Sequence, residues 1–559
     1  MRSVPLLCLV LAGVAAPALA ADAADLVLRH ARIWTGDAAR PEAQALAVVG
    51  ERIVALGTDA EIAAWVGPKT RLLDAGGRRV VPGLTDSHTH FFDGGFTLLT
   101  IDLRYAASRE EFARRLGEFA AKLSKGEWVL GGEWDHERWP GAPLPRREWI
   151  DAAVGDHPVF VQRLDGHMGL ANSIALKLAG ITRDTKDPAG GTIVRDERGE
   201  PTGVLKDAAM GLVFNVVPPP TPEQYRQALL AAEKRAGELG VTSVHDITMW
   251  PEWEALAAAK KRGELTVRFY SRTPLAQWER QRDLVGAQGA GDAWLRLGGF
   301  KAYMDGSLGS STAYFFQPYL DSPGNFGLLA EDWHPEGILH DRIAAADRAG
   351  FQVSVHAIGD RANAMLLDVF AQVAKENGPR DRRFRVEHAQ HLRSEDIARF
   401  AALGVVPSMQ PYHEADDGRW AEKRIGSERC RTTYAFRSLL DSGAKLAFGS
   451  DWPVATLDPL QGISAAVTRR TLDGKNPGGW IPEQKISVAE ALAAYTSGAA
   501  WAAFQENDKG TLAPGKLADF VELSADLLAV APDDIAGIHA LRTVVGGRVV
   551  FEAAAAPAH

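Results

Sequence analysis

Eight short apolar runs, most of them separated by stretches with helical spacing, constrain the fold of this 559-residue chain more than any other feature. Each run has the length and composition of a buried strand. The intervening stretches 223–240 and 339–350 have helical periodicity and end at glycine, a common helix stop. Strand and helix alternating eight times predict an α/β fold built on a (β/α)8 barrel of the TIM type. The runs are 81–88, 241–246, 266–271, 295–301, 351–356, 384–388, 404–409 and 445–450.

Residues that can bind metals stand at the C-terminal ends of five of these runs. His88 and His90 are two residues apart at the end of the first run, so both imidazoles project to the same side of a strand. Neutral imidazole is the commonest metal ligand among side chains, and a barrel of this type carries its active site at these strand ends. The pattern therefore predicts a metal site there. The candidate ligands are His88, His90, Lys301, His356, His388 and Asp451.

The two ends of the chain share a pattern of short apolar runs divided by turn residues such as Gly50 and Gly57. Because the runs at the two ends resemble each other, we expect them to pair with one another. Residues 21–80 and 501–559 are then the two parts of one small β-sandwich domain, and the barrel takes residues 81–500.

The stretch 91–240 is too long to be a single crossover between neighbouring barrel strands. We interpret it as a subdomain inserted after the first barrel strand and lying over the barrel mouth. Its residues Trp134, Trp139 and Trp149 are expected to form the core of this subdomain rather than a platform for substrate.

The N-terminus has the pattern of a secretory signal peptide over residues 1–20. Arg2 supplies the positive charge, residues 4–16 are almost wholly apolar, and Ala18-Leu19-Ala20 matches the small-x-small cleavage pattern. The apolar run is too short for a membrane span. We expect a periplasmic or secreted protein. Of the two cysteines Cys8 leaves with the signal, so Cys430 has no internal disulfide partner.

The composition of the chain limits the kinds of molecule that it is expected to bind. The net charge of −9 and the lack of a basic run argue against a nucleic-acid surface. A hydrophobic content of 46% and a charged content of 24% are ordinary for a soluble globular protein. We expect a small-molecule substrate and no membrane span after signal removal. Composition does not decide between a monomer and a homo-oligomer.

Taken in order, the motifs along the chain resemble the amidohydrolase superfamily, and within it the YtcJ-like branch that includes N-substituted formamide deformylases. The resemblance covers nearly the whole chain after the signal. One departure is Ser497 after the late threonine, where many relatives have asparagine. The motifs are Pro82-Gly83-Leu84-Thr85-Asp86-Ser87-His88-Thr89-His90, Asp165-Gly166-His167, Asp305-Gly306-Ser307-Leu308-Gly309-Ser310 after Lys301, His356-Ala357-Ile358-Gly359-Asp360, Glu387-His388-Ala389-Gln390, Gly449-Ser450-Asp451-Trp452-Pro453 and the C-terminal stretch 510–519.

The resemblance implies a centre of two divalent metal ions of the zinc type. Lys301, carboxylated on its amine, would bridge them, because a lysine desolvated among cations loses its proton and can take up carbon dioxide. Such ligands suit zinc, iron, manganese and nickel alike. One metal would be held by His88, His90 and Asp451, and the other by His356 and His388.

The same resemblance implies hydrolysis of a C–N bond in an amide, an N-formyl group or a cyclic amide. A hydroxide bridging the metals would attack the carbonyl carbon. Asp451 would act as general base and then as general acid toward the leaving nitrogen. His167 would hydrogen-bond the carbonyl or a substrate anion; in the alternative interpretation it only caps the turn before Ala171.

Other interpretations of the same residues stay open at this point. An esterase or lactonase could use the same site, a mononuclear deaminase would leave Lys301 without a role, and a non-catalytic protein could keep the metal site as scaffold. Lys301 could be an ordinary strand-end lysine paired with Asp305. His245, His391 and His413 near strand ends are expected to serve structure or ligand orientation.

Substrate recognition is expected in two places. One is the insertion 91–240. The other is the loop 411–426, where Tyr412, Trp420 and Arg424 are candidate contacts.

Overall fold

The computed structural model describes residues 23–136, 139–163, 168–188 and 191–554. The predicted signal peptide with Cys8, and the candidate residue His167, lie outside the described residues. Among those described, every helix is too short or too polar to span a bilayer.

The predicted barrel is confirmed. Its eight strands form one sheet in the order β21-β20-β19-β18-β17-β16-β15-β8, and all neighbours pair in parallel. A bridge between Thr89 and Trp452 brings the last strand against the first and nearly closes the ring. The strands are β8 (Leu84–Thr89), β15 (Val241–Ile247), β16 (Arg268–Pro274), β17 (Leu295–Tyr303), β18 (Gln352–Ala357), β19 (Arg385–His388), β20 (Val406–Met409) and β21 (Ala447–Phe448).

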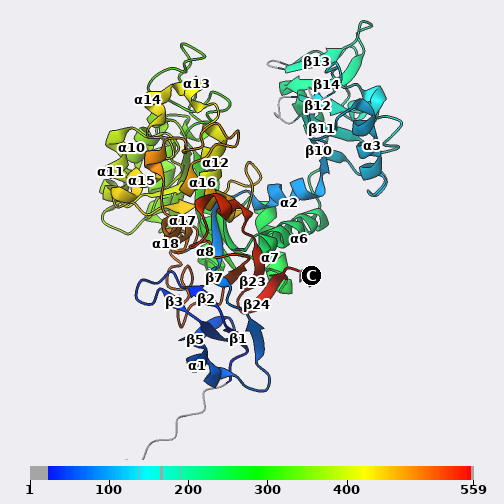
Figure 1. Cartoon of the computed structure of the whole chain (residues 1–559). Helices are drawn as coiled ribbons and strands as arrows, with labels where there is room; N and C mark the ends of the chain where they lie inside the picture. The colour runs from blue at the N-terminus through cyan, green and yellow to red at the C-terminus, as the bar shows by residue number, and fades with distance from the viewer. Residues whose placement is uncertain (1–22, 137–138, 164–167, 189–190, 555–559) are drawn as a thin grey trace, which may run out of the picture.

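Helices cover the outside of this sheet, as Figure 1 shows. The stretches predicted as helices form α6 (Pro222–Glu238) and α9 (Ile338–Arg348), which differ from the prediction by one or two residues at each end. Helix α6 begins with a capping box, in which Thr221 and Gln224 satisfy each other's backbone N–H groups. Its buried face, which includes Leu229, packs in a cluster with strand residues such as Val244.

One predicted strand proved to be two. The run 81–88 is divided between β7 (Arg79–Pro82), which belongs to a different sheet, and β8. Pro82 has no N–H to donate, and the N–H of Gly83 bonds to the carbonyl of Asp519. A Cβ at Gly83 would lie 2.3 Å from Thr242 Oγ1, so the chain crosses from one sheet to the other at a point of close packing. Apolar character alone could not reveal this break.

The two ends of the chain meet in one sheet, as predicted. Strands β24, β23 and β22 from the C-terminal end lie beside β7, β2 and β3 from the N-terminal end in the order β24-β23-β22-β7-β2-β3. A neighbouring sheet, β5-β4-β1-β6, comes from the N-terminal part alone. Figure 1 shows both at the base of the barrel. The strands are β1 (Leu26–Arg29), β2 (Arg32–Trp34), β3 (Glu42–Ala43), β4 (Ala45–Val49), β5 (Arg52–Gly57), β6 (Arg71–Asp74), β22 (Phe520–Leu523), β23 (Ala540–Val545) and β24 (Arg548–Glu552).

The insertion after the first barrel strand has its own six-stranded sheet, in the order β13-β14-β12-β11-β10-β9, and helix α3 (Arg109–Ala120). Trp134 and Trp139 are buried with Phe112, and Trp149 packs against them, so the tryptophans form core as predicted. Figure 1 shows the insertion set apart from the barrel, in contrast to the expected position over its mouth. The strands are β9 (Ile101–Asp102), β10 (Val129–Trp134), β11 (Val159–Arg163), β12 (Met168–Ala171), β13 (Gly191–Arg195) and β14 (Pro201–Asp207).

The closure between the last and first barrel strands leaves no room for a side chain at Gly449. A carboxylate oxygen of Asp86 accepts hydrogen bonds from the N–H groups of His88 and Ser450, each at 3.0 Å. A Cβ on Gly449 would lie 2.5 Å from the nitrogen of His88 and 2.6 Å from Asp86 Oδ1. The backbone on either side of this glycine leads directly to two candidate ligands, His88 and Asp451.

We therefore expect Gly449→Ala to lower the stability of the barrel by about 1–3 kcal/mol, the range for overpacking a filled site. Thermal unfolding followed by circular dichroism measures the effect. Gly478→Ala is the matched control, because a Cβ there meets no atom within 4 Å. Equal melting temperatures for the two variants would contradict the close approach.

Candidate metal centre

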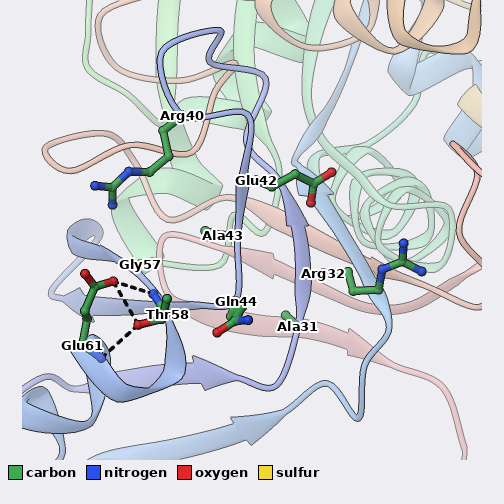
Figure 2. Close-up of a pocket in the computed structure, with 9 residues that line it drawn as sticks. All are labelled: Ala31, Arg32, Arg40, Glu42, Ala43, Gln44, Gly57, Thr58 and Glu61. Atoms are coloured by element: carbon green, nitrogen blue, oxygen red, sulfur yellow. Dashed lines mark hydrogen bonds between the residues drawn. The ribbon is translucent and has the colours of Figure 1, made fainter.

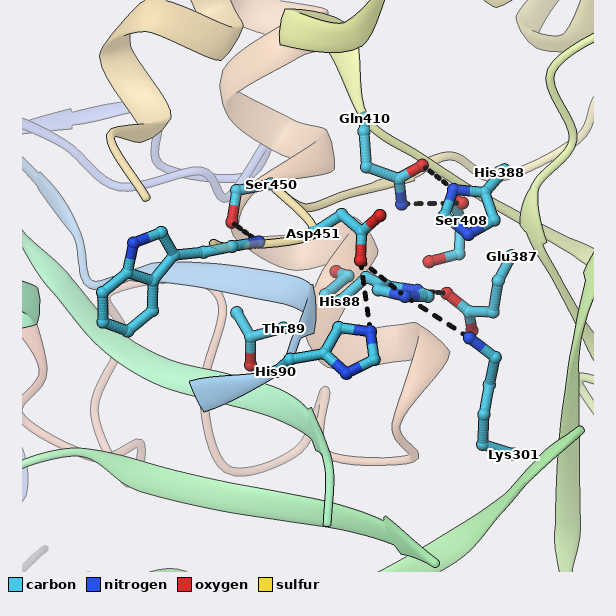
Figure 3. A network of polar contacts seen from close by, with 12 residues as sticks. His88, Thr89, His90, Lys301, Glu387, His388, Ser408, Gln410, Ser450 and Asp451 are labelled. Carbon is cyan, nitrogen blue, oxygen red and sulfur yellow. Dashed lines mark hydrogen bonds and ion pairs between the residues drawn. The ribbon is translucent and has the colours of Figure 1, made fainter. Parts of the chain in front are cut away.

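All six candidate ligands line one cavity of about 480 Å³ at the C-terminal ends of the barrel strands. Figure 3 shows the side chains from β8, β17, β19 and the segment after β21 converging on one point. Their positions follow from strand geometry, because the carboxyl ends of parallel strands meet at one end of a barrel. The six are His88, His90, Lys301, His356, His388 and Asp451.

Asp451 lies at the centre of the group. Its Oδ1 is 3.3 Å from Nε2 of His88 and 3.4 Å from Nε2 of His90. Ligand atoms of His88, His388 and Asp451 all lie within 4.8 Å of one another. His388 and Asp451 have positive φ angles of 75° and 61°, an uncommon backbone conformation that often marks functional sites.

Neighbouring acceptors fix how the histidine rings face the cavity. Nδ1 of His88 contacts Glu387, and Nδ1 of His388 lies 2.8 Å from Oε1 of Gln410, so both rings keep Nε2 for a ligand. Nε2 of His356 lies 3.0 Å from the carbonyl of Gly306, which leaves Nδ1. Acceptors of this kind set the tautomer and orientation of metal-binding histidines.

The electrostatics of the group suit a cation. Burial and the charge of Lys301 lower the pKa of His356 to about 3, and burial together with His356 holds the pKa of His388 well below its usual range. Burial alone would raise the pKa of Asp451, but contacts with His88 and His90 outweigh it and hold that pKa well below the ordinary value. Neutral imidazoles around an ionised carboxylate are a donor set for a divalent metal.

Lys301 is buried, and no carboxylate among the described residues forms an ion pair with it. Its Nζ lies 3.5 Å from Nε2 of His88 and 4.4 Å from the centre of the Tyr303 ring. Burial lowers its pKa to about 7, so a large share of the amine is neutral at neutral pH.

Asp305, the partner in the alternative interpretation of Lys301, is engaged elsewhere. Its two oxygens accept the backbone N–H groups of Tyr314, Ile358 and Gly359 at 2.8, 3.0 and 2.8 Å. Among the described contacts there is no Lys301–Asp305 ion pair. These hydrogen bonds give Asp305 a supporting role, because they tie the loop after β17 to the loop after β18.

Beneath the ligands lies a buried charge cluster that the sequence interpretation missed. Glu387 contacts His88 on one side and Arg272 and Arg385 on the other, with Arg385 Nε at 2.9 Å. Burial would raise the Glu387 pKa, but the two guanidinium groups outweigh burial and keep it well below its usual range. The signal was present in the chain, because Arg385 and Glu387 are two residues apart and therefore lie on the same face of the buried strand β19.

The three further histidines differ in environment. His245 bonds to Arg385 at 3.0 Å and His391 to Thr433 Oγ1 at 2.7 Å, which is consistent with the structural service expected of them. His413 instead lines the cavity, and its ring is stacked on that of His388 with centroids 6.4 Å apart. Its buried Nε2 has no hydrogen-bond partner among the described residues.

Only some of the residues predicted to contact substrate line the cavity. Tyr412 and Trp420 line the cavity, whereas Arg424 does not; it bonds to Ser311 and to the carbonyl of Gly309 at 3.2 Å. No described residue of the insertion 91–240 lines this cavity.

A second hollow of about 480 Å³ lies in the domain formed by the chain ends (Figure 2). Its polar groups are engaged locally: Thr58 and Glu61 form the capping box of helix α1 (Asp59–Ile62), and Arg40 donates to the carbonyl of Leu56. Its described lining contains no histidine or cysteine. The candidate catalytic site is therefore the barrel cavity.

A parallel barrel with imidazoles and a carboxylate gathered at its strand ends has the architecture of a metal-dependent hydrolase. The chain belongs to the amidohydrolase family, which it matches over residues 71–551.

Three relatives cover most of the chain. It is 42% identical over 544 residues to the protein LONG AFTER FAR-RED 3 of Arabidopsis thaliana, covering 94% of this chain and 92% of the relative. It is 33% identical to the putative amidohydrolase YtcJ of Bacillus subtilis, covering 87% and 91%. It is 27% identical to the N-substituted formamide deformylase of Arthrobacter pascens, covering 94% and 98%. The predicted YtcJ-like membership is thereby confirmed.

A solved structure agrees with the fold. An uncharacterized metal-dependent hydrolase from Pyrococcus furiosus superimposes with a TM-score of 0.75 at 28% identity, covering 90% of this chain and 99% of that one.

Proposed function

We propose that this protein is a metal-dependent hydrolase that cleaves a C–N bond in an amide, an N-formyl group or a cyclic amide. The observation that carries the proposal is the Asp451 carboxylate, which faces the cavity in contact with His88 and His90. Family membership and the similarity to an N-substituted formamide deformylase support the amide class.

The residues present fit a pair of divalent metals. His88, His90 and Asp451 would hold one, and His356 and His388 the other. The fit rests on ring nitrogens left free by Glu387 and Gln410 and on the ionised Asp451. Bound metals would polarise the carbonyl and supply hydroxide at neutral pH.

Lys301 fits a bridging role between the two metals. Its amine lacks an ion-pair partner among the described residues, and its pKa of about 7 provides the neutral form that can attack carbon dioxide. The nitrogen forms a bond to the carbon of carbon dioxide and loses a proton, which gives a carbamate with two oxygen donors. A mononuclear deaminase would leave Lys301 without a role, and this supports the two-metal proposal.

The residues of the chain carry out the proton transfers. Water adds its oxygen to the carbonyl carbon while Asp451 takes up a proton, and Asp451 then passes that proton to the nitrogen as the C–N bond breaks. Glu387 and Gln410 hold His88 and His388 in the required orientation.

A substrate panel tests the proposal. Formanilides, N-alkylformamides, acetamides and lactams are each compared with the ester or lactone of matched shape, before and after chelation. We expect hydrolysis of at least one amide class, loss of activity with the chelator, and recovery with added zinc. Turnover of the esters alone would favour the esterase alternative, and no turnover of any compound would favour a non-catalytic metal-binding protein.

A further inference from the structure

The wall of the site cavity contributed by helix α12 (Pro411–Asp417) has a partly buried carboxylate, Asp417, that the proposed reaction does not use. Asp417 lines the cavity, and its Oδ2 accepts hydrogen bonds from Gln390 Nε2 at 2.6 Å and Tyr434 OH at 2.7 Å. Both donors come from buried residues. The carboxylate is therefore held rigidly, and its other oxygen, Oδ1, has no hydrogen bond among the described residues.

No lysine or arginine among the described residues forms an ion pair with this carboxylate. Burial raises the pKa of Asp417, whereas the hydrogen bond from Tyr434, the charge of His413 and the hydrogen bond from Gln390 lower it. The described residues that line the cavity include no arginine, and their only lysine is Lys301. A partly buried carboxylate without a lysine or arginine partner favours a cationic group at this point of the cavity.

The neighbouring carboxylate is different. Asp416 also lines the cavity, but it is in contact with Arg419, and both side chains are well exposed. Its charge is thus already balanced at the surface. The two adjacent aspartates therefore differ in their ion pairs: Asp416 has an arginine partner, and Asp417 has none among the described residues.

Asp417 is connected to the metal centre through its neighbours. Gln390, which donates to Asp417, follows the candidate ligand His388 by two residues, and His413 of the same helix stacks on the His388 ring. Tyr412 and Trp420 line the cavity beside it and offer ring faces of the kind that favour cations and apolar groups.

We propose that Asp417 is a specificity residue that binds an ammonium group of the substrate, so that the preferred substrates are amides carrying a positively charged amine. This inference rests on the proposed function in placing the scissile carbonyl at the metal centre. The ammonium group donates to Oδ1 of Asp417, and the rings of Tyr412 and Trp420 cover the apolar part of the substrate.

A binding experiment tests this without requiring turnover. The affinities of the zinc-loaded protein for 3-phenylpropylammonium and for 3-phenylpropanol are measured at pH 7 by calorimetry. We expect the ammonium compound to bind about 30-fold or more tightly, because a partly buried carboxylate without an ion pair gains a charged hydrogen-bond donor. Equal affinities, or preference for the alcohol, would overturn the proposal, and this comparison needs no variant.

Variants then locate the site. Asp417→Asn is expected to remove most of the preference for the ammonium compound and to leave alcohol binding unchanged. Asp416→Asn, the matched control, should change neither affinity by more than about twofold, because an exposed ion pair contributes little. Unchanged ammonium binding in Asp417→Asn, with melting temperature retained, would place the amine elsewhere, for example on the metal, and would overturn the proposal.

The outcomes separate the two proposals. If the ammonium preference depends on Asp417 but no amide is hydrolysed, the subsite stands and the proposed reaction fails. If neutral amides and their aminoalkyl analogues are hydrolysed equally well, and Asp417→Asn leaves this ratio unchanged, the proposed reaction stands and the subsite is overturned.

Discussion

Replacement of Asp451 by asparagine is expected to lower kcat by about 10²–10⁴-fold, the usual contribution of a positioned acid–base group. Asparagine preserves the shape of the side chain but has no basic oxygen to accept a proton. Because Oδ1 of Asp451 contacts both His88 and His90, metal affinity should also fall. The measurements are kcat on an amide identified in the panel, metal content, and the melting temperature, which should change little.

Asp93→Asn is the control for this variant. Its carboxylate lies 3.8 Å from Nδ1 of His90 but has 65% of its side chain exposed, so the loss of its charge should change kcat by no more than about threefold. If Asp451→Asn kept substantial activity with its metals bound, the proton-transfer role of Asp451 would have to be abandoned.

Replacement of Glu387 by glutamine is expected to give the largest loss of stability, about 3–5 kcal/mol. The variant leaves the guanidinium groups of Arg272 and Arg385 buried with no compensating charge, since all three side chains are fully buried. His88 loses the acceptor that orients it, so metal affinity should fall by about 10–100-fold. Urea unfolding of the metal-free protein isolates the first effect, and metal titration measures the second.

The control for Glu387 is Glu552→Gln. Glu552 pairs with Arg542 at 2.7 Å but is half exposed, and removing an exposed pair should cost no more than about 1 kcal/mol. A loss for Glu387→Gln as small as this one would show that the buried cluster does not hold the barrel together.

Much of the fold could be predicted from local patterns of apolar residues in the sequence. The eight apolar runs were visible because the strands of a parallel barrel are buried on both faces, and the ligand positions followed from where such strands end. Chain order therefore placed His88 and Asp451 at the same end of the barrel although 363 positions separate them. The division of 81–88 between two sheets was missed because it depends on close packing of Gly83 against Thr242.

Features that depend on contacts between distant segments were less predictable. Arg272 joins Glu387 across the barrel interior, and Asp417 is held by Tyr434, and no local periodicity records either pairing. The position of the insertion beside the barrel depends on how its connecting segments run, which apolar pattern does not encode. The signal peptide and the role of His167 stay predictions.

The proposed pair of metals bridged by Lys301 can be tested by measuring the metal content per chain. Elemental analysis of the zinc-supplemented wild type and of Lys301→Ala is the measurement. We expect about two metals per chain in the wild type and a sharp fall in the variant, because the bridging group is lost. About one metal per chain, unchanged in Lys301→Ala, would contradict the bridge and favour mononuclear chemistry instead.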